Sequence, residues 1–168
     1  MTDLESKIYY AKIAQVCAEN SKATKLKVGA IIVKDKQIIS DGFNGTPSGF
    51  DNTCETNICN GLSNELCYYE AHLCIPGSMC NHIQCSRKIL KTKPEVLHAE
   101  SNAILKCAKF GRSTDGADIY ITHAPCIECA KLIIQAGIKN VYYINNYRSS
   151  DGIKLLEYTD IYVERIKL

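Results

Sequence analysis

His98-Ala99-Glu100 and Pro125-Cys126-Ile127-Glu128-Cys129 are the two short stretches from which the rest of this sequence is interpreted. A catalytic zinc takes three protein ligands from histidine, cysteine or carboxylate side chains and leaves a fourth position open for water. His98, Cys126 and Cys129 supply such a set. Glu100 remains as a candidate for proton transfer, so the two stretches together predict one catalytic zinc site.

Both stretches are expected at the starts of helices. An α-helix turns about 100° per residue, so His98 and Glu100 would face nearly opposite ways in a helix interior and are placed at a helix start instead. The apolar spacing that follows them, ended by a glycine, predicts that helix. Pro125 suits the first turn of a second helix, which puts Cys126 and Cys129 on one face of that turn. The positive end of its dipole would favour both thiolates.

Length and composition indicate one ordinary globular domain, residues 1–168. The net charge of +2 argues against a nucleic acid as the main partner, although a few clustered cations could hold one phosphate. No apolar run approaches a membrane span, and the first residues lack the features of a signal peptide, so a cytoplasmic protein without membrane contact is expected. In such a protein the ten cysteines suggest metal binding or core packing rather than disulfides.

Hydrophobic periodicity predicts an alternation of helices and strands. Thr2 and Glu5 have the spacing of a capping box, and a first helix follows to about Glu19. Two β-rich runs next to it read as an antiparallel hairpin, and the later strand, helix, strand, helix, strand pattern implies parallel pairing through right-handed crossovers. The result is a mixed sheet between helix layers. The predicted strands are residues 28–33, 37–40, 119–122, 140–144 and 161–166, with helices from Pro125 and near residues 152–158.

Two loops have open interpretations. Gly42-Phe43-Asn44-Gly45-Thr46-Pro47-Ser48-Gly49 is too rich in glycine and proline for a strand, and it is either a tight turn or a loop whose backbone approaches a nucleotide. Lys22, Lys25 and Lys27 belong either to a solvated basic loop or to a phosphate contact.

A Cys/His-rich insertion is predicted at about residues 51–97. The segment that begins at Cys54 and ends at Cys85 contains six cysteines, with His72 and His82 among them. A second, structural zinc with four ligands is the preferred explanation, and free thiols in a long insertion are the alternative. Within this pattern, the fragment His82-x-x-Cys85 has the spacing most typical of metal ligands.

A family resemblance follows from these motifs. His-x-Glu followed by Pro-Cys-x-x-Cys is the signature of zinc-dependent nucleobase deaminases. The loop 42–49 is similar to a Gly-Tyr-Asn-Gly-x-Pro-x-Gly loop, joined to Val28-Gly29-Ala30 at the first strand. With these features the chain resembles the deoxycytidylate (dCMP) deaminases of the cytidine deaminase superfamily over nearly its whole length, with Phe43 in place of the usual tyrosine. The resemblance implies a three-layer α/β/α fold with a five-stranded mixed sheet.

The resemblance also implies an activity. It is the zinc-dependent hydrolysis of dCMP to dUMP and ammonia, which supplies dUMP for thymidylate synthesis, with Glu100 moving protons between water, the cytosine N3 and the leaving ammonia. Asn44 is expected to contact the sugar. Tyr147 and Arg148, which follow a strand end, are candidates for base cover and phosphate contact.

Further properties are implied by the resemblance alone. Similar deaminases are homo-oligomers, often hexamers, activated by dCTP and inhibited by dTTP, with Mg²⁺ accompanying the triphosphates. Some microbial members have a second zinc site. The implied ligands of that second zinc are Cys54, Cys59, His82 and Cys85, and the implied effector contacts are Lys25, Gly42, Phe43, Asn44 and Gly45.

Other functions share part of the pattern. A deaminase of dCTP, of tRNA adenosine or of free cytosine would carry the same zinc signature, although a tRNA partner fits poorly with the mild charge. A lone Cys-x-x-Cys could also be a redox motif or part of a zinc-stabilised binding module without turnover. Glu100 discriminates between these classes, because a structural zinc is closed by four ligands and has no use for an unligated carboxylate.

Overall fold

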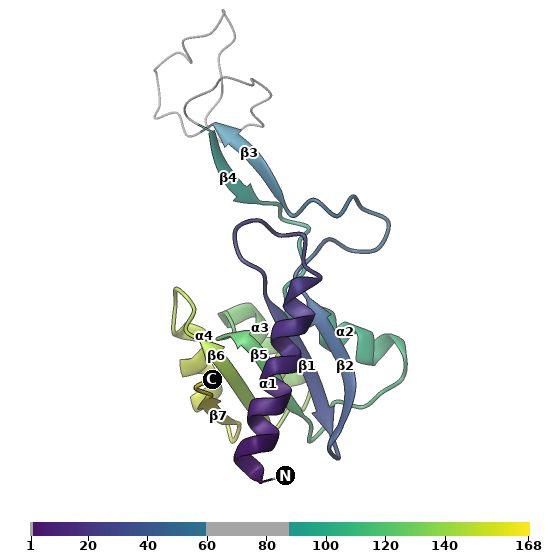
Figure 1. Cartoon of the computed structure of the whole chain (residues 1–168), viewed down its shortest axis with the longest axis vertical. Coiled ribbons are helices and arrows are strands. Elements are labelled where there is room, and N and C mark those ends of the chain that lie inside the picture. Colours follow the sequence, from purple (N-terminus) through teal and green to yellow (C-terminus); the bar gives the residue numbers. More distant parts are fainter. Residues whose placement is uncertain (1, 60–87) are drawn as a thin grey trace, which may run out of the picture.

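The computed structural model of the chain describes residues 2–59 and 88–168, and its centre is a five-stranded sheet (Figure 1). β1 is antiparallel to both β2 and β5, whereas β5, β6 and β7 run parallel to one another. The predicted fold class, with an antiparallel first hairpin and parallel C-terminal strands, is confirmed. In spatial order the strands are β2 (Gln37–Phe43), β1 (Gly29–Lys34), β5 (Asp118–His123), β6 (Asn140–Asn145) and β7 (Tyr162–Arg165).

Helices cover both faces of the sheet. Successive strand residues point to opposite faces, so in β1 the side chains of Ala30 and Ile32 enter one core and those of Ile31 and Val33 enter the other. The first core is shared with α2 (Ala99–Lys109), α3 (Ile127–Gln135) and α4 (Asp151–Glu157), and the second with α1 (Asp3–Glu19). The architecture therefore has the three predicted layers. No helix in the described ranges is long and apolar enough to cross a membrane.

Local sequence features explain where α1 begins and how the chain turns between β1 and β2. The predicted capping box is confirmed, because the Glu5 backbone N–H donates to Thr2 Oγ1 and the Thr2 backbone N–H donates to Glu5 Oε2. The turn between β1 and β2 is formed by Asp35 and Lys36, with φ angles of 50° and 63°. Positive φ at both central residues matches the right-handed twist of a two-residue hairpin.

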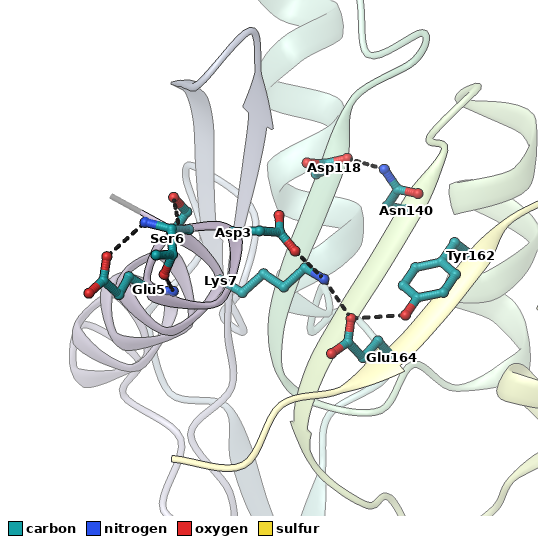
Figure 2. Close-up of polar contacts among 9 residues, drawn as sticks. Asp3, Glu5, Ser6, Lys7, Asp118, Asn140, Tyr162 and Glu164 are labelled. Carbon is teal, nitrogen blue, oxygen red and sulfur yellow. Dashed lines mark hydrogen bonds and ion pairs between the residues drawn. The ribbon is translucent and has the colours of Figure 1, made fainter.

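An ion-pair network joins α1 to the last strand (Figure 2). Lys7 Nζ lies 2.9 Å from a carboxylate oxygen of Asp3 and 2.9 Å from one of Glu164 in β7. The hydroxyl of Tyr162 donates to the same Glu164 oxygen at 3.1 Å. Lys7 Nζ is also 5.2 Å from the ring centroid of Tyr142 in β6. These contacts fix the N-terminal helix across the parallel strands.

Two predicted boundaries are wrong. Pro125 is not in the first turn of its helix, because α3 begins at Ile127 with Cys126 as the N-cap. The loop predicted from Gly42 begins two residues later, because Gly42 and Phe43 complete β2. A Cβ atom at Gly42 would lie 2.2 Å from the carbonyl oxygen of Ala99, so this glycine allows α2 to approach the sheet.

A second, two-stranded sheet was not predicted. β3 (Glu55–Cys59) and β4 (Lys88–Thr92) pair antiparallel and extend away from the main sheet as an arm (Figure 1). Both strands are short and rich in polar residues, so their apolar alternation is weak. The arm lies inside the predicted insertion at about residues 51–97, and the division of the chain at those bounds stays a prediction.

Two of the four residues predicted to bind a second zinc belong to this part of the chain. Cys54 directly precedes β3, and Cys59 is the last residue of the strand. Burial raises the pKa of the Cys54 thiol. His82 and Cys85 lie outside the described residues, so the four-residue ligand set stays a prediction.

Candidate active site

His98, Cys126 and Cys129 converge on one point where α2 and α3 begin. The Nδ1 atom of His98 lies 3.4 Å from the Cys126 sulfur and 3.3 Å from the Cys129 sulfur. The three potential ligand atoms all lie within 4.8 Å of one another, and they are the one such group found in the described part of the chain. The structure thus brings together the three residues predicted as ligands of the catalytic zinc.

Helix N-termini explain this convergence. His98 is the N-cap of α2 and Cys126 is the N-cap of α3, both with extended backbone angles, and neither side chain forms a capping hydrogen bond. Cys129 is the third residue of α3, and side chains at the N-cap and at this position meet, as they do in a capping box. The positive ends of the two helix dipoles also favour negative charge at this point.

The three side chains fit a zinc ion. Zinc bonds of about 2.3 Å to sulfur and about 2.0–2.1 Å to nitrogen, at tetrahedral angles, separate the sulfur and nitrogen ligands by about 3.5 Å. The separations of 3.3 and 3.4 Å between His98 and the two thiols are close to this value. Three ligands leave one tetrahedral position for water, which is the arrangement of catalytic rather than structural zinc.

Hydrogen bonds among the three candidate ligands shift their pKa values. The contact with the Cys129 thiol, together with that to His98, lowers the pKa of Cys126 to about 3. Its thiolate in turn raises the pKa of His98. The hydrogen bond to Cys126 and burial raise the pKa of Cys129, so in the absence of metal this thiol keeps its proton. A bound cation would take the place of that proton.

Glu100 is the buried acid of the site. Its side chain is 4% exposed, and burial raises the pKa of its carboxyl to about 6. The carboxyl lies close enough to Cys129 to form a side-chain hydrogen bond. Because Glu100 follows the N-cap His98 by two residues, the first turn of α2 presents both groups to the same place. A carboxyl with a pKa near 6 can both accept and donate protons near neutral pH.

A cavity of about 110 Å³ opens beside these residues. It lies outside the carboxyl end of β5, where ligands of open α/β sheets commonly bind. Three residues predicted from sequence to contact substrate or effector line it, namely Lys25, Asn44 and Tyr147. The complete lining is Lys25, Leu26, Val28, Asn44, Glu55, Thr92, Val96, His98, Ala99, Glu100, His123, Ala124, Cys126 and Tyr147.

The remaining predicted contacts do not line this cavity. Arg148 stacks its guanidinium 5.3 Å from the ring centroid of Tyr147. Gly42 packs under α2, and the Phe43 ring lies 5.9 Å from Lys106 of that helix. Gly45 forms two backbone hydrogen bonds with Leu97, the residue before His98. The predicted effector residues therefore fall into two groups. Lys25 and Asn44 line the cavity, whereas Gly42, Phe43 and Gly45 contact α2 or the residue that precedes its N-cap.

Sequence interpretation missed three polar residues of the cavity, which are His123, Glu55 and the Glu55 cross-strand partner Thr92. His123 ends β5, and its position at the carboxyl end of a parallel strand was the available signal. Its Nδ1 lies 3.1 Å from the hydroxyl of Thr122. Glu55 had no such signal, because it lies among the cysteines of the insertion and reaches the cavity only through the fold of the arm.

Comparison with known proteins gives consistent matches. The family model described as the cytidine and deoxycytidylate deaminase zinc-binding region matches residues 4–145. The chain is 38% identical to ComE operon protein 2 of Bacillus subtilis, covering 95% of this chain and 70% of that protein. It is 35% identical to deoxycytidylate deaminase of Enterobacteria phage T4, covering 81% and 76%. A crystal structure of dCMP deaminase from the cyanophage S-TIM5 with dCMP and dUMP superposes with a TM-score of 0.74 at 40% identity, covering 99% of each chain.

Proposed function

Because the chain belongs to the cytidine and deoxycytidylate deaminase family, we propose that it hydrolyses the exocyclic C–N bond of dCMP to give dUMP and ammonia. It is thereby a hydrolase acting on a C–N bond of a cyclic amidine. The observation that carries the proposal is the convergence of His98, Cys126 and Cys129 beside the buried carboxyl of Glu100. The product dUMP would supply thymidylate synthesis.

The residues of the site divide into holding and proton-transfer roles. His98, Cys126 and Cys129 would hold zinc through one nitrogen and two sulfur atoms. A zinc ion held by these residues would supply Lewis acidity, which lowers the pKa of a water molecule to about 7. Glu100 would accept a proton from the water that attacks C4 and pass it to N3 of the cytosine ring. The same carboxyl would then move the second proton of that water to the C4 amino group, so that the C4–N bond breaks, ammonia leaves and the water oxygen becomes the C4 carbonyl.

Polar residues of the cavity would recognise the rest of the nucleotide. Asn44 would contact the sugar and Tyr147 would cover the base, and both line the cavity. Lys25 is the one lysine or arginine among the described lining residues, which supports it as the contact to the 5′-phosphate. Arg148 is a weaker candidate for that contact because it is held against Tyr147 outside the lining.

Regulation by triphosphates is a further part of the proposal. dCTP with Mg²⁺ would activate and dTTP would inhibit a homo-oligomer, in which the loop 42–49 would respond to the effector. In support, Gly45 in this loop and Leu97 exchange backbone hydrogen bonds of 3.1 and 2.9 Å. A displacement of the loop would therefore act on the start of α2, where His98 and Glu100 lie.

An assay of ammonia release tests the substrate. Zinc-loaded protein should release ammonia from dCMP in preference to dCTP, deoxycytidine and cytosine, with dUMP as the matching product. Faster release from dCTP would change the substrate but retain the chemistry. No release from any of the four would refute the proposed function.

A further inference from the structure

Glu55 is a buried carboxylate whose hydrogen bonds go to the backbone and side chain of one neighbouring loop. It is 7% exposed and lines the cavity. The backbone N–H of Thr24 donates to both of its oxygens at 3.2 Å, and the Thr24 hydroxyl donates to Oε2 at 3.2 Å. The backbone N–H of Lys25 donates to Oε1, also at 3.2 Å. Among the described residues no lysine or arginine forms an ion pair with this carboxylate.

Hydrogen bonds with residues outside it hold the loop 20–28 at three places. At its start, the Ser21 hydroxyl donates to the carbonyl of Asn44 at 2.7 Å. At its end, the Asn44 side chain accepts from the Val28 N–H at 2.8 Å and donates to the Leu26 carbonyl at 2.9 Å. Between these two points, Glu55 makes the contacts to Thr24 and to the backbone of Lys25 itself.

Lys25 is left available for a ligand. Its side chain is exposed and lines the cavity, and no carboxylate in the described ranges forms an ion pair with it. Lys27 is engaged elsewhere, because its ammonium donates to the carbonyl of Glu19 at the end of α1. Because the Glu55 carboxylate bonds to the backbone of Lys25 rather than to its ammonium, the lysine charge stays unneutralised while its Cα is fixed.

We propose that Glu55 is a positioning residue for phosphate recognition, which fixes the backbone of Lys25 so that its ammonium meets the 5′-phosphate of a nucleoside monophosphate. The inference rests on the proposed function. Glu55 acts through Lys25 and does not touch the reacting atoms. It opens β3, and its cross-strand partner Thr92 also lines the cavity, so the base of the arm forms part of the substrate site.

The expected effect is on substrate binding. An ammonium on a freely moving loop loses more conformational entropy when it binds phosphate than one that is already held. Glu55→Gln keeps the shape of the side chain but replaces one acceptor oxygen by an NH₂ group, which cannot accept from Thr24 or Lys25. An interaction made equally in the ground and transition states changes KM and leaves kcat unchanged.

The test is steady-state kinetics on dCMP with zinc-loaded wild type, Glu55→Gln, Lys25→Met and the double variant. Glu55→Gln and Lys25→Met should each raise KM by about tenfold or more, with kcat within about twofold of wild type. The double variant should have a KM no higher than that of Lys25→Met, because Glu55 acts through Lys25. Zinc content and thermal midpoint are measured for each protein.

Asp51→Asn is the matched control. It removes the same charge near the base of the arm, and Asp51 pairs with Lys93 at 3.0 Å and has a largely exposed side chain. It should leave the KM unchanged. If Glu55→Gln does not fold, Glu55→Asp replaces it, since this change keeps the charge and withdraws the carboxylate by one methylene, and it should also raise KM.

Three results would overturn the inference. They are an unchanged KM in the Glu55 variant, a fall in kcat at unchanged KM, and effects of the two substitutions that multiply in the double variant. These results occur with a wild type that turns over dCMP, so the proposed function would stand. A zinc-loaded wild type without dCMP turnover would overturn both.

Discussion

At the scale of single residues, Glu100 is the proposed proton-transfer group of the site. It is buried, burial raises its pKa to about 6, and it lies beside the three residues that fit zinc. The amide of Glu100→Gln cannot accept a proton, so turnover should fall by about 10²-fold or more while the metal is retained. Metal analysis and the rate on dCMP check this together. Near-normal activity with zinc bound would exclude Glu100 from the mechanism.

Cys126 is proposed to bind zinc, so its substitution should change the metal content as well as the activity. As the N-cap of α3 it forms no capping hydrogen bond, so Cys126→Ser should remove the proposed metal ligand with little loss of helix stability. We expect loss of zinc and of activity with a modest change in the thermal midpoint of the metal-free protein. A variant that kept full zinc and turnover would show that Cys126 is not a ligand.

At the scale of elements, the spacing between β2 and α2 depends on Gly42. A Cβ atom there would lie 2.2 Å from the Ala99 carbonyl oxygen and 2.6 Å from the Ala103 nitrogen. Gly42→Ala must push α2 outward, and overpacking of this kind costs about 1–3 kcal/mol. The free energy of unfolding should fall by that amount, and dCMP turnover should fall with it, because α2 carries His98 and Glu100.

Gly45→Ala is the control for this substitution. A Cβ atom at Gly45 would have its nearest neighbour, the Asn52 side-chain oxygen, at 3.4 Å. Stability close to wild type is therefore expected. Equal losses in the two variants would mean that the close approach of α2 is not the cause.

A second prediction at the scale of elements concerns the contribution of the ion-pair network of α1 to stability. Hydrogen bonds to Glu164 and Asp3 raise the pKa of Lys7, so its stabilising contribution is fully present below the ordinary lysine pKa of 10.5 and is lost only at higher pH. Lys7→Met should lower the free energy of unfolding at neutral pH by about 0.5–1 kcal/mol, and by less in high salt.

Lys12→Met serves as the matched variant, because Lys12 is exposed on the same helix. Chemical denaturation at two salt concentrations measures both proteins. A Lys7→Met protein as stable as Lys12→Met would show that the network in Figure 2 does not anchor the helix.

At the scale of the whole molecule, the prediction concerns regulation. We expect sigmoidal dCMP kinetics that become hyperbolic with dCTP and Mg²⁺ and are suppressed by dTTP, in a homo-oligomer detectable by analytical ultracentrifugation. An effector acts only through its differential affinity for two states, and a difference of about 2 kcal/mol would change activity at low substrate about thirtyfold. A hyperbolic curve that neither triphosphate alters, in a fully active enzyme, would contradict this prediction.

The sequence by itself determined the candidate residues of the site and most of the sheet. The ligand and proton-transfer candidates are recognisable from residue type and local spacing, because the first turn of a helix brings residues two or three apart to one point. Strand and helix periodicities are local as well, so β1, β5, β6 and the three-layer order could be predicted. The boundary errors at Pro125 and Gly42 were also local, since N-cap geometry and glycine packing override propensity there.

Only the tertiary structure decided which distant residues share the cavity. Lys25, Glu55, Thr92 and His123 come from four separate elements or loops, and no periodicity relates them. Their meeting depends on the antiparallel pairing of the arm and on the carboxylate contacts of Glu55 with the loop 20–28. Such contacts form between residues far apart in sequence, and their positions depend on how complete elements pack. The same packing placed Arg148 against the Tyr147 ring rather than in the lining of the cavity.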